Sequence, residues 1–511
     1  MSTSNSQFST DSFDFADTAA LIRLANDLFA ALPGEHPKLG TALSAATDFV
    51  NQQGGVAALM PDLPGLEAFA SIPSVSSLPV HSSAPFYFLD GVSLLGGVPA
   101  LTAPVAALDI HAVRRDFPIL REQVNGRPLV WLDNAATTQK PQSVIDRIAY
   151  FYAHENSNIH RAAHELAARA TDAYEGAREI SRRFLNARSV NELVFVRGTT
   201  EAINLVAKSW GRENIGKDDE IVITHLEHHA NIVPWQQLVA ETGAKLRVAP
   251  VDDSGQVILD EYAKLLNGRT KLVSLTQVSN ALGTVTPAGE MVKLAHAVGA
   301  RVLVDGAQSV SHLRADVQAL DCDWFVFSGH KIFGPTGIGV LYGKEELLNS
   351  TGPWQGGGNM IKDVTFEKTE YHAAPGRFEA GTGNIADAVG LGAALAYVEK
   401  LGIENIAAYE HSLLTYGMQK LGDIPGLRLI GTAENKASVM SFVLDGFTTE
   451  EVGKALNQVG VAVRTGHHCA QPILRRFGLE ATVRPSLALY NTFDEVDLLV
   501  STVARLKQGR R

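Results

Sequence analysis

From about residue 109 onward, short apolar runs alternate with segments of helical pattern. Runs of this length, rich in Val, Ile, Leu and Phe, are typical of buried strands. Strands that alternate with helices predict an α/β domain around a largely parallel sheet. The predicted strands occupy residues 192–198, 220–226, 271–278, 301–308, 323–329 and 337–343, and helical patterns follow the first three at 199–211, 231–243 and 290–299.

The chain ahead of this region carries one amphipathic stretch, residues 17–34. Its apolar residues recur at three- and four-residue steps, so they form one stripe on a helix near 17–32. Asp17 is suited to cap the helix start, and Pro33-Gly34 ends it. A lone helix this short is marginal in water, so its apolar face needs a partner in this chain or in another protein. The stripe comprises Leu21, Leu24, Ala25, Leu28, Phe29 and Leu32.

Residues 35–107 differ from the rest in composition. Lys and Arg are absent from 39 to 113, and prolines recur at 61, 64, 73, 79, 85, 99 and 104. Proline fits neither helix interiors nor central strands, so we expect this segment to be mostly disordered. Its short apolar clusters, such as "GLEAF" and "PFYFLDG", leave two interpretations open: a linker with scattered hydrophobic residues, or a set of short motifs that bind a partner.

The overall composition narrows the class of protein. Hydrophobic residues make up 45% and charged residues 19% of the 511 positions, as in soluble globular proteins. The net charge of −11 argues against binding to nucleic acid or to anionic membranes, which requires a basic surface. Two distant cysteines make no disulfide framework, and neither a secretory signal nor an apolar run of about 18 residues occurs. We therefore expect a cytoplasmic protein.

Polar residues directly after the predicted strands are candidates for chemistry, because ligands of such sheets gather at the carboxyl ends of the strands. Lys331, in "SGHKIFGPTGIG", follows one apolar strand, where a surface charge is out of place. Asp305 ends another strand and needs a partner if it is buried. Together they predict pyridoxal phosphate, with Lys331 forming the Schiff base and Asp305 on the pyridinium nitrogen. The phosphate would lie at the helix start at 199, whose free N–H groups bind anions, with Thr200, Ser328 and His330.

His228, in "HLEHHAN", follows another predicted strand. Its imidazole can stack on a pyridine ring and carry protons. The alternative is a metal site built from His225, His228, His229 and the 467–469 cluster. These histidines lack a consistent metal-ligand spacing, so we predict no metal.

Seven motifs give the chain from about 109 to 508 a resemblance to a known family. The residues are similar to those of the cysteine desulfurases, class V aminotransferase-like enzymes of pyridoxal-phosphate fold type I, and most similar to the group-II, SufS-like branch. The resemblance implies a large mixed-sheet domain over 109–375 and a smaller α+β C-terminal domain over 376–511, preceded by a largely disordered extension over 1–108. The motifs are "WLDNAATTQKP", "FVRGTTEAINLVA", "EHHANIVPWQ", "VLVDGAQSV", "SGHKIFGPTGIGVLYG", "RFEAGTGN" and "VRTGHHCAQP".

The resemblance also implies roles for individual residues. Lys331 would be the Schiff-base lysine, His228 the stacking and proton-transfer histidine, and Asp305 the partner of the ring nitrogen. The cofactor would further be bound by Thr199, Thr200, Gln308, Ser328 and His330, and by Thr382 from a partner subunit of a homodimer. The substrate would be bound by Asn280, Arg484, His160 and Arg464. Arginine suits this task because its planar guanidinium offers two donors to a carboxylate.

The two cysteines receive different interpretations. In the resembling family, the counterpart of Cys469 takes sulfur from L-cysteine as a persulfide and alanine is released. A thiolate is the attacking species, and Arg464, His467 and His468 could favour its ionisation. Cys322, in "LDCDWFVF", starts an apolar strand, so we expect it to be buried and inert.

The extension over 1–108 resembles that of cysteine desulfurases carried as cargo inside encapsulin nanocompartments. This resemblance implies an encapsulin shell protein as partner and a location inside the compartment within the cytoplasm. A SufE-like protein would be the sulfur acceptor. Two alternatives stay open: a selenocysteine lyase of the same fold, and a shell-bound scaffold that carries sulfur.

Overall fold

The computed structural model describes residues 108–160 and 164–509. All of them belong to one compact unit of the chain, Thr102–Arg511. The helix predicted near 17–32 and the predicted disorder of the extension lie outside the described residues.

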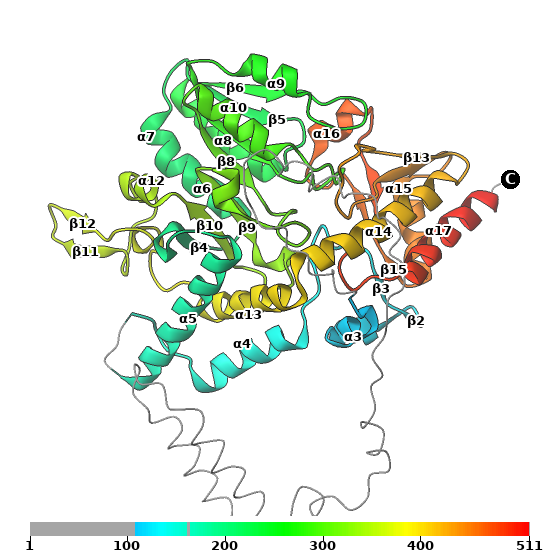
Figure 1. The fold of residues 1–511 in the computed structure, drawn as a ribbon, viewed down its shortest axis with the longest axis horizontal. Coiled ribbons are helices and arrows are strands. Elements are labelled where there is room, and N and C mark those ends of the chain that lie inside the picture. Colours follow the sequence, from blue (N-terminus) through cyan, green and yellow to red (C-terminus); the bar gives the residue numbers. More distant parts are fainter. Residues whose placement is uncertain (1–107, 161–163, 510–511) are drawn as a thin grey trace, which may run out of the picture. The chain divides into compact units, whose positions relative to one another are not determined.

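A mixed seven-stranded sheet forms the centre of this unit, as the sequence predicts (Figure 1). Neighbouring strands from β9 to β6 run parallel. The strand β10 runs antiparallel to both of its neighbours, β9 and β4. In spatial order the strands are β4 (Leu193–Val196), β10 (Gly339–Gly343), β9 (Trp324–Ser328), β8 (Arg301–Asp305), β7 (Thr270–Thr276), β5 (Glu220–Thr224) and β6 (Lys245–Ala249).

The central strands are buried on both faces. In β5, Ile221 and Val222 are both fully buried, although they point to opposite sides of the sheet. Val222 joins a cluster with residues of α5, α10 and α13, whereas Ile221 joins a second cluster with α6 and α8. Covered faces explain the continuous apolar runs in the sequence. The helices are α5 (Glu165–Phe184), α6 (Thr199–Val206), α8 (Val233–Thr242), α10 (Ala288–Ala297) and α13 (Ile385–Leu401).

The edge strand β6 is not buried on both faces and lacks a continuous apolar run. Its sequence "KLRVA" exposes Lys245, Arg247 and Val248, and within residues 108–160 and 164–509 no strand pairs with it on its outer side. Such a half-polar run lacks the apolar continuity by which the other strands were predicted. Smaller helices and one π-helical stretch complete this part of the fold: α4 (Gln142–His154), η6 (Ala207–Gly211), α7 (Arg212–Asn214), α9 (Leu259–Leu265), α11 (Val317–Leu320) and α12 (Glu345–Ser350).

A second, four-stranded sheet with its own apolar cluster follows α13 in the chain. Its order is β13 (Leu427–Leu429), β14 (Phe442–Leu444), β17 (Thr482–Arg484) and β16 (Arg464–Gly466). The helices α14 (Ile403–Gly422), α15 (Thr449–Gln458) and α17 (Phe493–Gln508) contribute to that cluster. The short helix α16 (Gln471–Arg476) instead buries Ile473 and Leu474 in an apolar cluster of the larger sheet. The preceding helix α13 lies beside α4 and α5, and all three contribute to the same apolar cluster of the larger sheet (Figure 1). The domain boundary at 375/376 stays a prediction.

One pairing joins the beginning of the described chain to this second region. The strand β3 (Val130–Trp131) pairs in parallel with β15 (Val461–Ala462). It follows α3 (Ile110–Arg115) and the hairpin β1 (Gln123–Val124) and β2 (Arg127–Pro128). A further hairpin consists of β11 (Ile361–Val364) and β12 (Thr369–Tyr371). Across the described residues, every helix is too short or too polar to cross a bilayer.

Candidate active site

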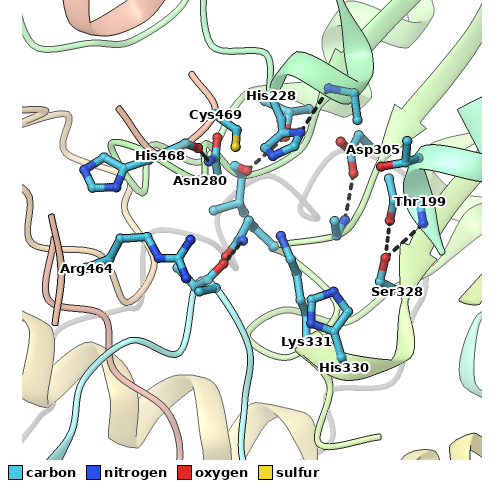
Figure 2. Close-up of a pocket in the computed structure, with 18 of the residues that line it drawn as sticks. Thr199, His228, Asn280, Asp305, Ser328, His330, Lys331, Arg464, His468 and Cys469 are labelled. Carbon is cyan, nitrogen blue, oxygen red and sulfur yellow. Dashed lines mark hydrogen bonds between the residues drawn. The ribbon is translucent and has the colours of Figure 1, made fainter. Parts of the chain in front are cut away.

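A cavity of about 220 Å³ opens where the strands β7, β8 and β9 end. Figure 2 shows side chains from these strand ends facing side chains from the second region across it. Twelve of the residues predicted from the sequence line this cavity: Thr199, Thr200, His228, Asn280, Asp305, Gln308, Ser328, His330, Lys331, Arg464, Cys469 and Arg484.

Lys331 projects into the middle of the cavity (Figure 2). It lies in a short 3-10 helix, Gly329–Lys331, directly after β9. Burial lowers the pKa of its amine to about 8, although the carboxylate of Asp305 opposes this shift. At this pKa roughly a tenth of the amine is unprotonated at pH 7, far more than for an ordinary lysine, and the unprotonated form is the one that attacks a carbonyl carbon.

Asp305 ends β8 at the base of the cavity and is 4% exposed. One of its oxygens, Oδ1, accepts a hydrogen bond from the N–H of Ala307 at 2.9 Å. Burial raises the pKa of the carboxyl group, and the nearby Lys331 amine acts against that shift. A buried carboxylate of this kind gains a partner when a ring N–H⁺ lies beside it.

The start of α6 forms a corner of the cavity near Asp305 (Figure 2). The Thr199 N–H donates to Ser328 Oγ at 2.9 Å, and the two hydroxyl oxygens are 3.0 Å apart. Gly198 precedes the helix at φ 153°, and a Cβ there would lie only 3.0 Å from Ser328 Oγ. The corner therefore combines hydroxyl groups with a helix N-terminus where the backbone is left uncovered, an arrangement that binds phosphate.

His228 presents a neutral imidazole to the cavity. Its Nδ1 accepts a hydrogen bond from the N–H of Ala230 at 3.0 Å, so its proton lies on Nε2. Burial lowers the pKa of this ring to about 3, with Lys331 contributing in the same direction. A neutral ring can stack on a flat cofactor and accept a proton. His330 is similar, because burial lowers its pKa to about 4.

These observations test whether the residues fit pyridoxal phosphate. The cavity holds a buried amine, a buried carboxylate with one hydrogen bond, an imidazole face and a corner suited to phosphate. Gln308 lines the same cavity, and its Nε2 donates to the carbonyl of Ala135 at 2.7 Å. The donor set fits the cofactor, and pyridoxal phosphate is the cofactor that this site is built to hold.

Arg484 and Asn280 form the wall on the side of the second region. Arg484 is 2% exposed, and its Nη1 donates to the carbonyl of Asn280 at 2.9 Å. Among the described residues, Arg484 Nε and Asn280 Oδ1 are buried without a hydrogen-bond partner. Unpaired buried polar atoms are costly, so a cation with a free N–H here is suited to a carboxylate ligand.

Asp133 is a site residue that the sequence reasoning did not single out. Its Oδ1 lies 3.3 Å from Arg484 Nη2, and its Oδ2 accepts from Arg464 Nε at 3.2 Å. The carboxylate thus holds both predicted substrate-binding arginines in place. The signal that could have revealed it is the acid directly after the apolar "VWL" in the motif "WLDN".

A buried lysine ties the Asn280 loop to the second region. Lys436 is 8% exposed, and its Nζ donates to the carbonyls of Leu282 and Gly431, the latter at 2.6 Å. Thr284 also forms a β-bridge with Lys436. Burial lowers the pKa of the Lys436 amine to about 7. The position of Asn280 therefore depends on contacts that cross between the two parts of the fold.

Cys469 lies opposite Lys331 in the turn between β16 and α16 (Figure 2). His468 and Cys469 both adopt left-handed backbone conformations, with φ of 53° and 54°. Each such residue costs about 1–2 kcal/mol relative to a right-handed one. The thiol is partly exposed, whereas His468 is buried and hydrogen-bonded to Thr482 Oγ1 at 2.8 Å.

The expected contribution of His468 to thiol ionisation needs correction. Burial lowers the pKa of its imidazole to about 3, with Arg484 adding to the shift. The ring is therefore neutral near pH 7 and supplies no positive charge to the thiol. Arg464 also lines the cavity and carries a permanent charge.

Cys322 is fully buried, as predicted. It precedes β9, and burial raises the pKa of its thiol far above the ordinary value, with Asp323 adding to the shift. A thiol of this kind is inert toward electrophiles.

Two predicted residues do not reach this cavity within one chain. Thr382 lines a second cavity of about 600 Å³. His160, next to the lining residue Ile159, pairs its Nε2 with Glu175 Oε1 at 3.0 Å. Both therefore lie apart from Lys331 in the single chain.

The sequence and the fold of this chain are similar to those of known proteins. Residues 130–499 match the model of the aminotransferase class-V family. A cysteine desulfurase of Synechococcus elongatus is 74% identical over 416 residues, which cover 81% of this chain; the chain spans 66% of that relative's length. A cysteine desulfurase of Klebsiella pneumoniae is 52% identical over 398 residues, 78% of this chain and 98% of its own. The solved structure of the cysteine desulfurase CsdA of Escherichia coli superimposes with a TM-score of 0.74 at 38% identity, covering 79% of this chain and 99% of its own.

Proposed function

The chain belongs to the class-V aminotransferase family and, within it, to the cysteine desulfurases, and from this premise we propose that it converts L-cysteine to L-alanine and retains the sulfur as a persulfide on Cys469. One observation carries the proposal: a buried amine with a lowered pKa and a partly exposed thiol line the same cavity. The high identity to cysteine desulfurases supports the choice of substrate.

Pyridoxal phosphate, when bound, supplies an aldehyde for an amine and a cationic ring that withdraws electrons from the substrate. Lys331 offers the amine, and its lowered pKa favours the nucleophilic form. Asp305 would stabilise a protonated ring nitrogen of the bound cofactor. The hydroxyl groups and the helix start at Thr199 would hold the phosphate.

The substrate would be oriented by its carboxylate. Arg484 is held by Asp133 and keeps a buried Nε without a partner among the described residues, so it can donate to the carboxylate. Asn280 lies beside it and contributes a second polar group to the wall. This orientation would direct the substrate's side chain toward Cys469, which lines the same cavity.

The sulfur transfer uses the Cys469 thiolate. Its Sγ attacks the sulfur of the substrate, and an S–S bond forms while the carbon–sulfur bond breaks. The electron pair of that bond goes to the substrate carbon, which takes up a proton, so alanine is released and Cys469 carries the persulfide. His228, whose neutral ring lines the same cavity, is suited to accept and return protons.

The test is a turnover assay with full-length protein, L-cysteine and a reducing thiol. Alanine and sulfide should appear in equal amounts, and mass spectrometry without the reductant should find one added sulfur on Cys469. The matched control is the Cys322→Ala variant. It should form the same persulfide on Cys469, because the Cys322 side chain that it removes is buried and does not line the cavity. Alanine formation without sulfur on either cysteine would contradict the proposal.

Assignment to the SufS-like branch and a homodimer are finer parts of the proposal. The motif "RTGHHCAQP" around Cys469 supports the first. Thr382 and His160 support the second, because both lie away from Lys331 in one chain and a partner subunit could bring them to its cavity. A SufE-like protein would then accept the sulfur. Sedimentation at assay concentration should show a dimer, and an active monomer would contradict this part.

We also propose that residues 1–108 direct the enzyme into an encapsulin shell. The support is in the sequence: Lys and Arg are absent from 39 to 113, short apolar motifs recur there, and the candidate catalytic residues lie beyond it. Several weak motifs on one tether would act together. Full-length and residue-109-onward proteins should be co-expressed with the cognate shell protein. The full-length chain should co-purify with shells and the truncated chain should not, with unchanged turnover; equal encapsulation would contradict the proposal.

A further inference from the structure

The backbone at Cys469 must be held by its surroundings. His468 and Cys469 both lie in the left-handed region, at φ 53° and 54°. Residues with a Cβ rarely adopt this conformation, and it persists only where neighbouring contacts enforce it. The residues that make those contacts therefore decide where the thiol points.

His229 makes three contacts to this turn. Its backbone N–H donates to the carbonyl of Cys469 at 2.8 Å. Its ring nitrogen Nε2 accepts a hydrogen bond from the N–H of Gln471 at 3.3 Å. Its ring also stacks on that of His467, with centroids 5.8 Å apart and an angle of 26° between the planes. These contacts hold the chain on both sides of the thiol.

His467 completes the arrangement from within the turn. Its Nδ1 accepts a hydrogen bond from the N–H of Cys469 at 3.0 Å. Both imidazoles thus accept from backbone N–H groups, so the proton of His229 lies on Nδ1 and that of His467 on Nε2. The stack and the two accepted hydrogen bonds link both rings to the backbone of the turn.

The two consecutive histidines of "EHHAN" face different surroundings. His228 lines the cavity, as do Ala230 and Cys469, whereas the side chain of His229 is not part of the lining. The contacts of His229 are instead to the turn that carries Cys469, through which it can act on the cavity.

We propose that His229 is a positioning residue that holds the Cys469 thiol toward the cavity by fixing the backbone on both sides of it. The proposal rests on the sulfur transfer proposed above. Loss of the imidazole leaves the N–H of Gln471 without its acceptor and removes the stack on His467. The backbone bond from residue 229 to the carbonyl of Cys469 remains, so the turn loosens while the fold persists.

The test compares three variants of the full-length holoenzyme. In His229→Ala, kcat should fall about 10- to 100-fold with KM for L-cysteine changed less than about twofold, because a misplaced thiol affects the transfer step and leaves substrate binding intact. The visible absorbance of the cofactor should stay unchanged. His229→Gln should restore much of kcat, because its amide oxygen can replace Nε2 as acceptor. His225→Ala is the matched control, since His225 lies in the same segment and its Nδ1 has no hydrogen-bond partner among the described residues.

A second readout is independent of turnover. Iodoacetamide should alkylate Cys469 faster in His229→Ala than in the wild type and the other two variants, as measured by peptide mass spectrometry; buried Cys322 serves as the internal reference. Wild-type kcat and alkylation rate in His229→Ala would overturn the proposal, as would a Gln variant indistinguishable from the Ala variant. If the wild type releases no alanine from cysteine, the proposed function fails, but the alkylation rates still decide whether His229 positions the thiol.

Discussion

The two ends of the cavity are built in different ways. At the Lys331 end, the functional groups lie at or directly after β8 and β9. These two strands pair with each other, and the apolar residues in their middle are fully buried. At the Cys469 end, the thiol lies in a turn between a three-residue strand and a short helix, and its backbone is left-handed at two successive positions. One end is placed by sheet register and the other by individual polar contacts.

This difference separates what the fold determines from what single side chains determine. Asp305 pairs in register with Thr276 on one side and Val326 on the other, so moving it would disturb the core of the sheet. The thiol depends on hydrogen bonds that contribute about 0.5–1.5 kcal/mol each. Mutations can therefore shift the thiol end gradually, whereas the lysine end should respond only to direct changes.

The largest expected effect removes the amine at the sheet-built end. Lys331→Ala should abolish turnover and the visible absorbance of the bound cofactor, because no other amine lies at the centre of the cavity among the described residues. Absorbance spectra and alanine release measure this. Lys362→Ala, at an exposed position in β11, should keep both signals. A fully coloured Lys331 variant would contradict the assigned role.

The next effect is confined to the loop-built end. Cys469→Ser should abolish alanine release from cysteine while the cofactor absorbance remains, because the hydroxyl is a poor nucleophile toward sulfur and Lys331 is unchanged. Spectra and single-turnover assays on the same sample measure both properties. Loss of cofactor in this variant would show that the two ends are not separable.

A smaller effect concerns Lys436, the buried lysine that connects the Asn280 loop to the second region. Its folded pKa of about 7 lies below the ordinary 10.5, so between these values the unfolded chain binds a proton that the folded chain has released. The free energy of unfolding should therefore rise with pH across this window, by at most about 1.4 kcal/mol per pH unit for one proton. Lys436→Met should show a smaller slope in urea unfolding between pH 7 and pH 9.5. Equal slopes would refute this origin.

The smallest effect tests the thiol that belongs to the sheet. Cys322→Ala should lower the free energy of unfolding by on the order of 1 kcal/mol, through loss of one small buried group. Turnover and cofactor absorbance should not change. Loss of turnover in this variant would reverse the roles assigned to the two cysteines.

The same contrast explains what could be predicted from the sequence. Six of the seven central strands were predictable because burial on both faces leaves continuous apolar runs, and the functional groups at their ends followed. The exposed edge strand β6 lacked that signal. Asp133 follows an apolar run and could have been noted as a candidate, but its pairing with Arg464 and Arg484 appears only in the fold. The role of His229 was not predictable, because it depends on a residue more than 200 positions away in the chain. His160 and Thr382 were inferred from resemblance, and a single chain does not bring them to Lys331.

The pairing of β3 with β15 has a consequence for synthesis of the chain. It joins residues 130 and 461, and the last strand of the small sheet, β17, comes only at 482–484. During translation, domains fold from the N-terminus as residues emerge, and distant pairings form late. A nascent chain can complete the seven-stranded sheet once β10 has emerged at residue 343, well before the thiol exists. The amine end is thus assembled first, and the chain becomes reactive toward sulfur only when its synthesis is almost finished.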